Sequence, residues 1–275
     1  MRTIAHLSDL HFGRIDQAVL PVLAQTIREA QPDVIVVSGD LTQRARPGEF
    51  RDAREFLAGL PFPQVIVPGN HDVPLYNVYM RAIHPLRRFR QFFAEQTAPF
   101  HADDEVSIVG VNTARSFTFK DGRINREQVA KVCRQMALGG QATRIVVTHH
   151  PFHGAQARGG DGLVGRASMA MAGFARCQID LVLSGHLHSG DAALSAQHYE
   201  QADYSALLVQ AGTATSVRRR GEPNSFNMIV IDRPHVAIER WSWDEVQARF
   251  EVSARERFIK AGGAWKAAPP GSSPP

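Results

Sequence analysis

Two absences narrow the class of this 275-residue chain. It has only two cysteines, Cys133 and Cys177, and both lie in helix-like stretches. Nothing therefore suggests a disulfide framework, and a reducing compartment is the simpler expectation. No apolar run is long enough to cross a bilayer, and residues 1–13 lack the apolar core of a signal peptide. We therefore expect a cytoplasmic protein.

The sequence also lacks internal repeats, a clear linker and a strong excess of one charge. Hydrophobic residues make up 44% of the chain, which allows a sizeable core and excludes a disordered protein. The formal net charge of +4 fits an anionic substrate but is too common to carry weight. We predict one domain over residues 1–260. Residues 261–275, rich in glycine, alanine and proline, are expected to form a disordered tail.

Short β-branched runs alternate with amphipathic stretches, which is typical of a layered α/β fold. Apolar residues recur at helical spacing in residues 17–30 and 49–60. Asn125 and Gln128 have the spacing of a capping box at the start of another helix. After Leu207 the strand-like runs follow each other without helices, and "DRPH" between two of them indicates a hairpin. We predict that the domain ends in antiparallel strands.

Five of the apolar runs end in side chains that bind metals. The segments are "HLSDLH", "VVSGDL", "IVPGNHD", "VVTHH" and "VLSGHLH". They supply Asp9, His11, Asp40, Asn70, His71, Asp72, His149, His150, His186 and His188. Ligands of α/β sheets collect at the carboxyl ends of strands, so we expect these side chains to meet in one cleft.

The spacing and chemistry of these residues favour a metal centre. Asp9 and His11 are two positions apart, as are His186 and His188, so in extended backbone each pair points to one side. A donor set of two carboxylates, one amide and four imidazoles drawn from these ten positions suits manganese, iron, zinc, cobalt or nickel better than calcium. Seven donors are too many for one ion that keeps a position open. We therefore predict two divalent or trivalent ions that share a carboxylate.

Each motif alone is weak, because "GD" or "GN" is more often a turn and a lone histidine after a strand is more often structural. Six further histidines lack the strand-end context and are expected to be structural or superficial: His6, His84, His101, His153, His198 and His235. The ordered occurrence of all five motifs is far more specific than any single one.

In this order, the motifs make the chain resemble the calcineurin-like metallophosphoesterase superfamily. The family pattern DxH, GDxx, GNHD, H and GHxH reads here "DLH", "GDLT", "GNHD", "HHP" and "GHLH", over residues 9–188. The length and the last two motifs are most similar to bacterial cyclic-nucleotide phosphodiesterases and glycerophosphodiesterases. The resemblance implies a four-layer α/β/β/α sandwich, with two packed mixed sheets flanked by helices and a dinuclear metal site at the strand ends.

The resemblance also implies a role for each residue of the site. One metal would be held by Asp9, His11 and His188, the other by Asn70, His149 and His186, and Asp40 would bridge them. His71 matches the catalytic histidine of the family, which is close to the phosphate without binding metal. Asp72 is expected either to orient His71 or to be a solvated turn carboxylate. His150 is expected to lie behind the ligands rather than among them.

We predict a phosphodiesterase in which a hydroxide that bridges the metals attacks phosphorus directly. His71 would stabilise the transition state or protonate the leaving group. The expected substrate is a small anionic phosphodiester, such as a 3',5'-cyclic nucleotide or a glycerophosphodiester. Alternatives are a nuclease or phospholipid head-group diesterase, a broad phosphomonoesterase or protein phosphatase, and a scaffold without metals, against which the filled ligand positions argue. The sequence has no strong nucleic-acid or membrane signal, and a homo-oligomer stays open.

Three segments near the site have two interpretations each. Residues 74–100 mix aromatic residues with arginines, either as a cap over an anionic substrate or as a helix whose arginines face solvent, and we favour the second. Residues 154–166 form either a glycine-rich lid or a long connection. Residues 218–220 are three arginines that either meet phosphate, nucleic acid or an acidic membrane surface or, as we favour, lie at a solvated hairpin tip.

Overall fold

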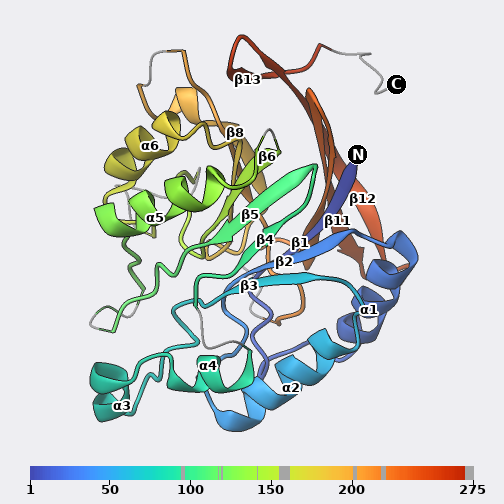
Figure 1. The fold of residues 1–275 in the computed structure, drawn as a ribbon. Coiled ribbons are helices and arrows are strands. Elements are labelled where there is room, and N and C mark those ends of the chain that lie inside the picture. Colours follow the sequence, from blue (N-terminus) through green and yellow to red (C-terminus); the bar gives the residue numbers. More distant parts are fainter. Residues whose placement is uncertain are drawn as a thin grey trace.

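Two mixed β-sheets pack face to face in the computed structural model, and helices cover their outer faces (Figure 1). The structure describes residues 1–93, 97–116, 118, 120–140, 142–154, 162–200, 203–217 and 221–269. Apolar side chains of both sheets form the central layer of the core, with Ile4, Val36 and Val67 from one sheet and Ile108, Val147 from the other. The fold class predicted from the sequence, a four-layer sandwich, is confirmed.

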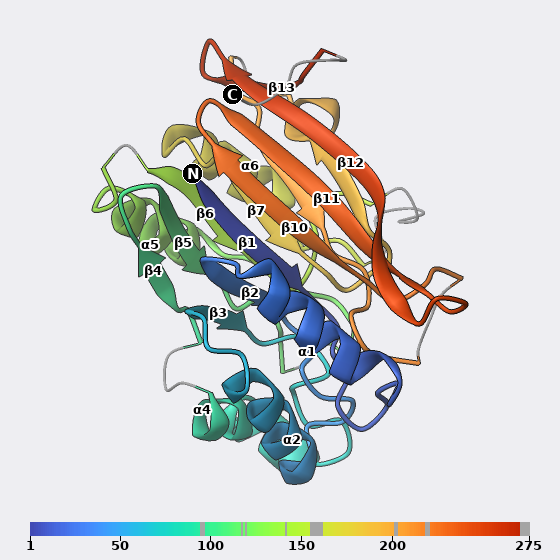
Figure 2. The same ribbon diagram turned by 90° about the vertical axis from the view of Figure 1, so that its right-hand side faces the viewer.

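The first sheet has the strand order β13-β12-β11-β10-β1-β2-β3. Its strands are β1 (Arg2–Leu7), β2 (Val34–Ser38), β3 (Gln64–Val67), β10 (Ser225–Asp232), β11 (His235–Asp244), β12 (Arg249–Ala261) and β13 (Ala264–Ala267). β1, β2 and β3 are parallel, whereas β10 to β13 form an antiparallel meander beside β1 (Figure 2). The predicted "DRPH" hairpin is present, because Asp232 pairs with His235.

The second sheet has the order β4-β5-β6-β7-β9-β8. Its strands are β4 (Phe100–Ala102), β5 (Val106–Gly110), β6 (Thr143–Val147), β7 (Leu181–Ser184), β8 (Asp191–Leu194) and β9 (Leu207–Gln210). The four central strands are parallel, and the two edge strands are antiparallel to their neighbours. The central strands are buried on both faces, which explains why they read as continuous apolar runs in the sequence.

The helices form the two outer layers of the sandwich. They are α1 (Val19–Ala30), α2 (Pro47–Ala58), α3 (Val78–Ile83), α4 (Arg87–Phe92), α5 (Arg126–Met136), α6 (Ala167–Arg176) and the 3-10 turn η2 (Ser195–Gln197). α1, α2 and α4 pack on the first sheet, and α5 and α6 pack on the second. The predicted capping box starts α5, where the Asn125 side chain accepts from the Gln128 N–H.

The prediction of a disordered tail from residue 261 is wrong for the part that the structure describes. β12 extends to Ala261, and after a turn at two glycines β13 pairs back onto it. Trp265 is buried, and its indole N–H donates to Asp180 at 3.0 Å. The indole needs both an apolar site and a hydrogen-bond acceptor, and the fold supplies both. Residues 270–275 lie outside the described residues.

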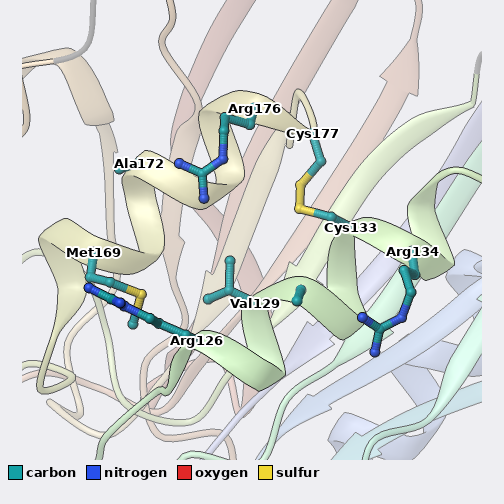
Figure 3. Close-up of a pocket in the computed structure, with 9 residues that line it drawn as sticks. Arg126, Val129, Cys133, Arg134, Met169, Ala172, Arg176 and Cys177 are labelled. Atoms are coloured by element: carbon teal, nitrogen blue, oxygen red, sulfur yellow. A yellow bond between two sulfur atoms is a disulfide. The ribbon is translucent and has the colours of Figure 1, made fainter.

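The expectation of two unpaired cysteines is also wrong. Cys133 in α5 and Cys177 after α6 form a disulfide with a Cα–Cα distance of 5.3 Å (Figure 3). α5 and α6 each connect two parallel strands, so they lie side by side and bring together residues 44 positions apart. Disulfides are typical of oxidising environments, so the inference of a reducing compartment loses its basis.

A cytoplasmic location stays a prediction. None of the described helices is long and apolar enough to span a membrane.

The insertion over residues 74–100 contains α3 and α4, which behave differently. In α4, Phe89 is fully buried and the Phe92 ring stacks on Phe50 of α2, as expected for a packed helix. In α3, Arg81 is buried and donates to the carbonyl oxygens of Pro74, Ser116 and Thr118. This arginine is neither solvated nor directed at a substrate; it fixes α3 to a neighbouring loop. Residues 94–96 lie outside the described residues.

Candidate metal centre

The carboxyl ends of β1, β2, β3, β6 and β7 bring the seven predicted donors to one edge of the two sheets. Asp9, His11 and His188 form the first group of donors. The His11 Nε2 and the His188 Nε2 lie 3.5 and 3.6 Å from the same carboxylate oxygen, Asp9 Oδ1. The donor atoms of this group all lie within 4.8 Å of one another. All three side chains are buried, and their donor atoms converge on one point.

The second group of donors surrounds His149. Its Nε2 lies 3.0 Å from Asn70 Oδ1 and 3.2 Å from His186 Nδ1. Asp40 lies between the two groups, because Oδ1 is 3.4 Å from His149 Nε2 and Oδ2 is 3.7 Å from His11 Nε2. The Asp40 carboxylate therefore faces both sets of donors, as the prediction of a shared carboxylate requires.

The imidazoles are oriented by partners on their other nitrogen. His149 Nδ1 lies 2.8 Å from the Ser38 carbonyl oxygen, which can only accept, so Nδ1 carries the proton and Nε2 presents a lone pair. His11 Nδ1 faces the Thr42 carbonyl oxygen, and His188 Nδ1 lies 2.6 Å from Thr213 Oγ1. Such outer partners are typical of histidines that bind metal, because they fix the tautomer and the ring angle.

The backbone at the donor positions is unusual. Five of the seven donor residues have a positive φ between 50° and 75°, although none is glycine: Asp9, His11, Asp40, His186 and His188. The backbone of residues other than glycine rarely adopts this left-handed region, and residues that do so cluster at functional sites. Gly69 allows the third loop to approach, because a Cβ there would collide with the Asp40 carboxylate.

The residues present fit a pair of transition-metal ions. Asp9 Oδ1 is fully buried without a hydrogen-bond partner, while Oδ2 accepts from Ser8 Oγ and the His186 N–H. A buried oxygen without a donor is costly unless a cation meets it. Burial alone would raise the pKa of Asp9, but the surrounding histidines, His188 first among them, hold it well below its usual value. Burial and His149 lower the pKa of His186 to about 3, so its ring is neutral, as a ligand must be.

His71 lies at the rim of the centre. Its ring is half-buried and meets the His11 ring edge to face at 4.9 Å. Its Nδ1 donates to the Gln43 carbonyl oxygen at 2.8 Å, and its backbone N–H donates to Asp40 Oδ1 at 2.8 Å. The same residue therefore fixes the shared carboxylate through its backbone and turns its imidazole toward the donors.

Both expectations for Asp72 are wrong. Its carboxylate is fully buried and accepts hydrogen bonds from the N–H groups of Gly69, Leu41 and Thr42 and from the Thr42 hydroxyl. It is thus not solvated, and the Gln43 carbonyl, not Asp72, orients His71. Burial and the neighbouring Asp40 raise the pKa of Asp72 to about 6, although these hydrogen bonds oppose the shift. Asp72 joins the loop after β2 to the loop after β3.

His150 lies close enough to His149 and His186 to form a third group of donors. Both of its ring nitrogens already have partners, however: Thr113 Oγ1 at 2.8 Å and the Lys120 carbonyl oxygen at 2.9 Å. Its Nε2 must donate to that carbonyl and so offers no lone pair to a metal. The ring packs on His186 at 4.7 Å, behind the donors.

Sequence reasoning missed the residues that hold the donors in place. Ser8 donates a hydrogen bond to Asp9, while the hydroxyls of Thr113 and Thr213 contact the rings of His150 and His188. A lone serine or threonine nevertheless carries no signal in the sequence.

Of the six histidines outside the motifs, His6 is buried beside Ser38, and His153 is buried 3.3 Å from Asp191. None of the six joins a donor group among the described residues. Of residues 154–166, expected to form a lid or a long connection, residues 155–161 lie outside the described residues, as do residues 218–220, expected to meet phosphate or to lie at a hairpin tip.

A model of the family described as calcineurin-like phosphoesterase matches residues 2–190, so the chain belongs to that family. The family resemblance inferred from the motifs is thereby confirmed.

Two curated relatives are diesterases by name. The chain is 30% identical over 163 residues to a glycerophosphodiester phosphodiesterase of Enterobacter lignolyticus, which covers 54% of this chain and 56% of that protein. It is 25% identical over 210 residues to a probable cyclic nucleotide phosphodiesterase of Synechococcus, which covers 68% of this chain and 73% of that protein. The chain thus spans little more than half the length of the first relative.

Solved structures share the fold. A dimetal phosphatase from Danio rerio superposes with a TM-score of 0.62 at 12% identity, over 87% of this chain and 95% of that one. A purple acid phosphatase from yellow lupin gives a TM-score of 0.69 at 12% identity, over 93% of this chain and 53% of that one. At this identity the likeness concerns the fold alone.

Proposed function

We propose that the protein is a phosphodiesterase that uses two metal ions. The observation that carries the proposal is the position of Asp40, whose two oxygens face two separate groups of donors. One group would be Asp9, His11 and His188, and the other Asn70, His149 and His186. The mixture of carboxylate, amide and imidazole donors supports manganese, iron, zinc, cobalt or nickel. When bound, such a pair of ions supplies an activated water and neutralises phosphate charge.

The chain's own residues would position the ester and handle the proton. His71 sits beside the donors with its Nδ1 proton held by the Gln43 carbonyl oxygen, so Nε2 is the nitrogen that faces the substrate. In its protonated form His71 would donate from Nε2 to a phosphate oxygen or to the leaving alkoxide. Thr42, Thr213 and Ser38 would keep the rings of His11, His188 and His149 in position.

A small phosphodiester is the substrate that we propose, either a 3',5'-cyclic nucleotide or a glycerophosphodiester. The names of the two curated relatives support this class. A scaffold without metals is disfavoured, because every predicted donor position is filled and the donors converge.

The test is a metal-reconstituted activity screen. The protein is stripped with a chelator, reloaded with manganese, and assayed with bis(p-nitrophenyl) phosphate, its monoester analogue, cyclic nucleotides and glycerophosphodiesters. We expect two ions per chain by elemental analysis and a clear preference for diesters. A preference for the monoester, or full activity in the stripped protein, would overturn the proposal.

A further inference from the structure

Three adjoining cavities lie along the outer surface of α5 and α6. The largest, about 680 Å³, lies between the helices and includes Arg126, Arg134 and Arg176 (Figure 3). A second cavity is lined by Arg126, Arg166 and Met169, of which Arg126 and Met169 also line the first. A third, about 350 Å³, shares Arg166 with the second. We call this row of three neighbouring cavities the arginine groove, after Arg115, Arg123, Arg126, Arg134, Arg166 and Arg176.

Among the residues that the structure describes, no carboxylate pairs with the positive charge of this groove. No aspartate or glutamate is among the described residues that line the three cavities. None of the six guanidinium groups forms an ion pair with a described carboxylate, whereas Arg2, Arg249 and Arg255 elsewhere do. Burial, and after it the nearby Arg166 and Arg115, lower the pKa of Arg123. Arginines gathered in this way are suited to bind an anion from outside the chain.

The groove is long enough for several anionic groups. Arg126 and Arg134 are eight residues apart on α5, which corresponds to about 12 Å along the helix. Arg166 directly precedes the ten-residue α6, and Arg176 is its last residue. Val129, Met169 and the disulfide form an apolar floor between them (Figure 3). A single phosphate would use only one end of such a track.

One end of the groove adjoins the metal centre. Arg123 follows Gly122, where a Cβ would collide with the His150 ring, and His150 packs on His186. Arg123 also pairs with Gly165, next to Arg166. The amino ends of α5 and α6 therefore lie at the catalytic edge of the sheet, and the groove leads away from that edge toward the disulfide.

We propose that the arginine groove binds single-stranded nucleic acid through its phosphates. A linear polyanion with one charge per about 3.4 Å of strand matches an extended row of guanidinium groups, which bind phosphate through two N–H donors. The concave shape, flanked by two helices, suits a strand better than the flat surface of a membrane. No aromatic residue lines the three cavities among the described residues, so the site reads the backbone and not the bases. This inference goes beyond the proposed diesterase activity and does not depend on it.

The experiment measures binding of a fluorescein-labelled 20-nucleotide oligothymidylate with phosphorothioate linkages to the metal-loaded protein by anisotropy. We expect affinity to fall on the order of a hundredfold between 50 and 200 mM salt if the six arginines contact phosphates. The double variant R126Q/R176Q should bind at least tenfold more weakly. Its slope of log K against log salt should be smaller by about 1.4, since each lost contact to a single strand removes about 0.7.

The matched control is R54Q, which removes an exposed arginine from α2 on the opposite outer layer and should bind the oligonucleotide like the wild type. Circular dichroism melting and metal content establish that each variant is folded and loaded. Equal binding by R126Q/R176Q and the wild type would overturn the proposal. So would displacement of the oligonucleotide by inorganic phosphate at the same phosphate concentration, which indicates a single-anion site. Tighter binding to phosphatidylglycerol vesicles, with no competition by the oligonucleotide, would assign the groove to a membrane instead.

Discussion

The metal centre and the arginine groove handle charge in opposite ways. In the centre, acidic and basic groups are buried together, and nearly every donor has a second contact that fixes its direction. In the groove, six groups of one sign lie on two helices and on the segments that precede them, without a carboxylate partner among the described residues. Removing one donor should therefore disable the centre, whereas removing one arginine should weaken the groove only gradually.

The largest effect is expected from Asp40→Ala. This change removes the one carboxylate that faces both donor groups, so the chain should lose at least one of its two ions. Turnover of bis(p-nitrophenyl) phosphate should fall on the order of a thousandfold or more. Elemental analysis and steady-state kinetics measure both quantities. The matched control is Asp52→Ala, an exposed aspartate of α2. A variant that keeps two ions and wild-type turnover would contradict the shared role of Asp40.

His71→Ala should separate catalysis from metal binding. The imidazole lies at the rim, and its contribution to turnover is expected to be roughly a hundredfold to a thousandfold, in the range of general acid catalysis. Metal content should stay at two ions per chain. If turnover of the chromogenic diester were unchanged, another group would have to supply the proton.

Asp72→Asn tests whether this carboxylate supports the loops or the imidazole. An amide cannot accept all four hydrogen bonds, so the free energy of unfolding should fall by roughly 1–3 kcal/mol. Urea denaturation of the metal-free protein measures this loss. Turnover of the loaded variant should stay far above that of His71→Ala. Equal turnover of the two variants, with unchanged stability, would restore Asp72 as the partner of His71.

The smallest effect is expected from Arg134→Gln at the outer end of the groove. Its guanidinium is one of six, so its loss should weaken oligonucleotide binding less than tenfold, by about 1 kcal/mol, as for an exposed ion pair. Anisotropy titration at low salt resolves such a change. A complete loss of binding would mean that the groove depends on one residue, as the metal centre does.

The features predicted correctly from sequence are local ones. The five apolar runs that precede the donors became strands, and each donor lies within four residues of the end of its strand, because both signals are local in the sequence. β12 was missed, since charged residues on one side interrupt its apolar alternation, as at Glu251 and Arg255. The partner of Asp72, the pairing of Cys133 with Cys177 and the groove all depend on residues far apart in sequence. Nothing in their neighbourhoods along the chain marks them.

The left-handed backbone at five donor positions has a consequence for metal exchange. The strained turns are formed by folding itself, and loops held by Asp72 and by the imidazole partners keep them in place. In the proposed centre, ions would meet donors that these turns already hold in place, so the exchange of one transition metal for another would not require the loops to be rebuilt.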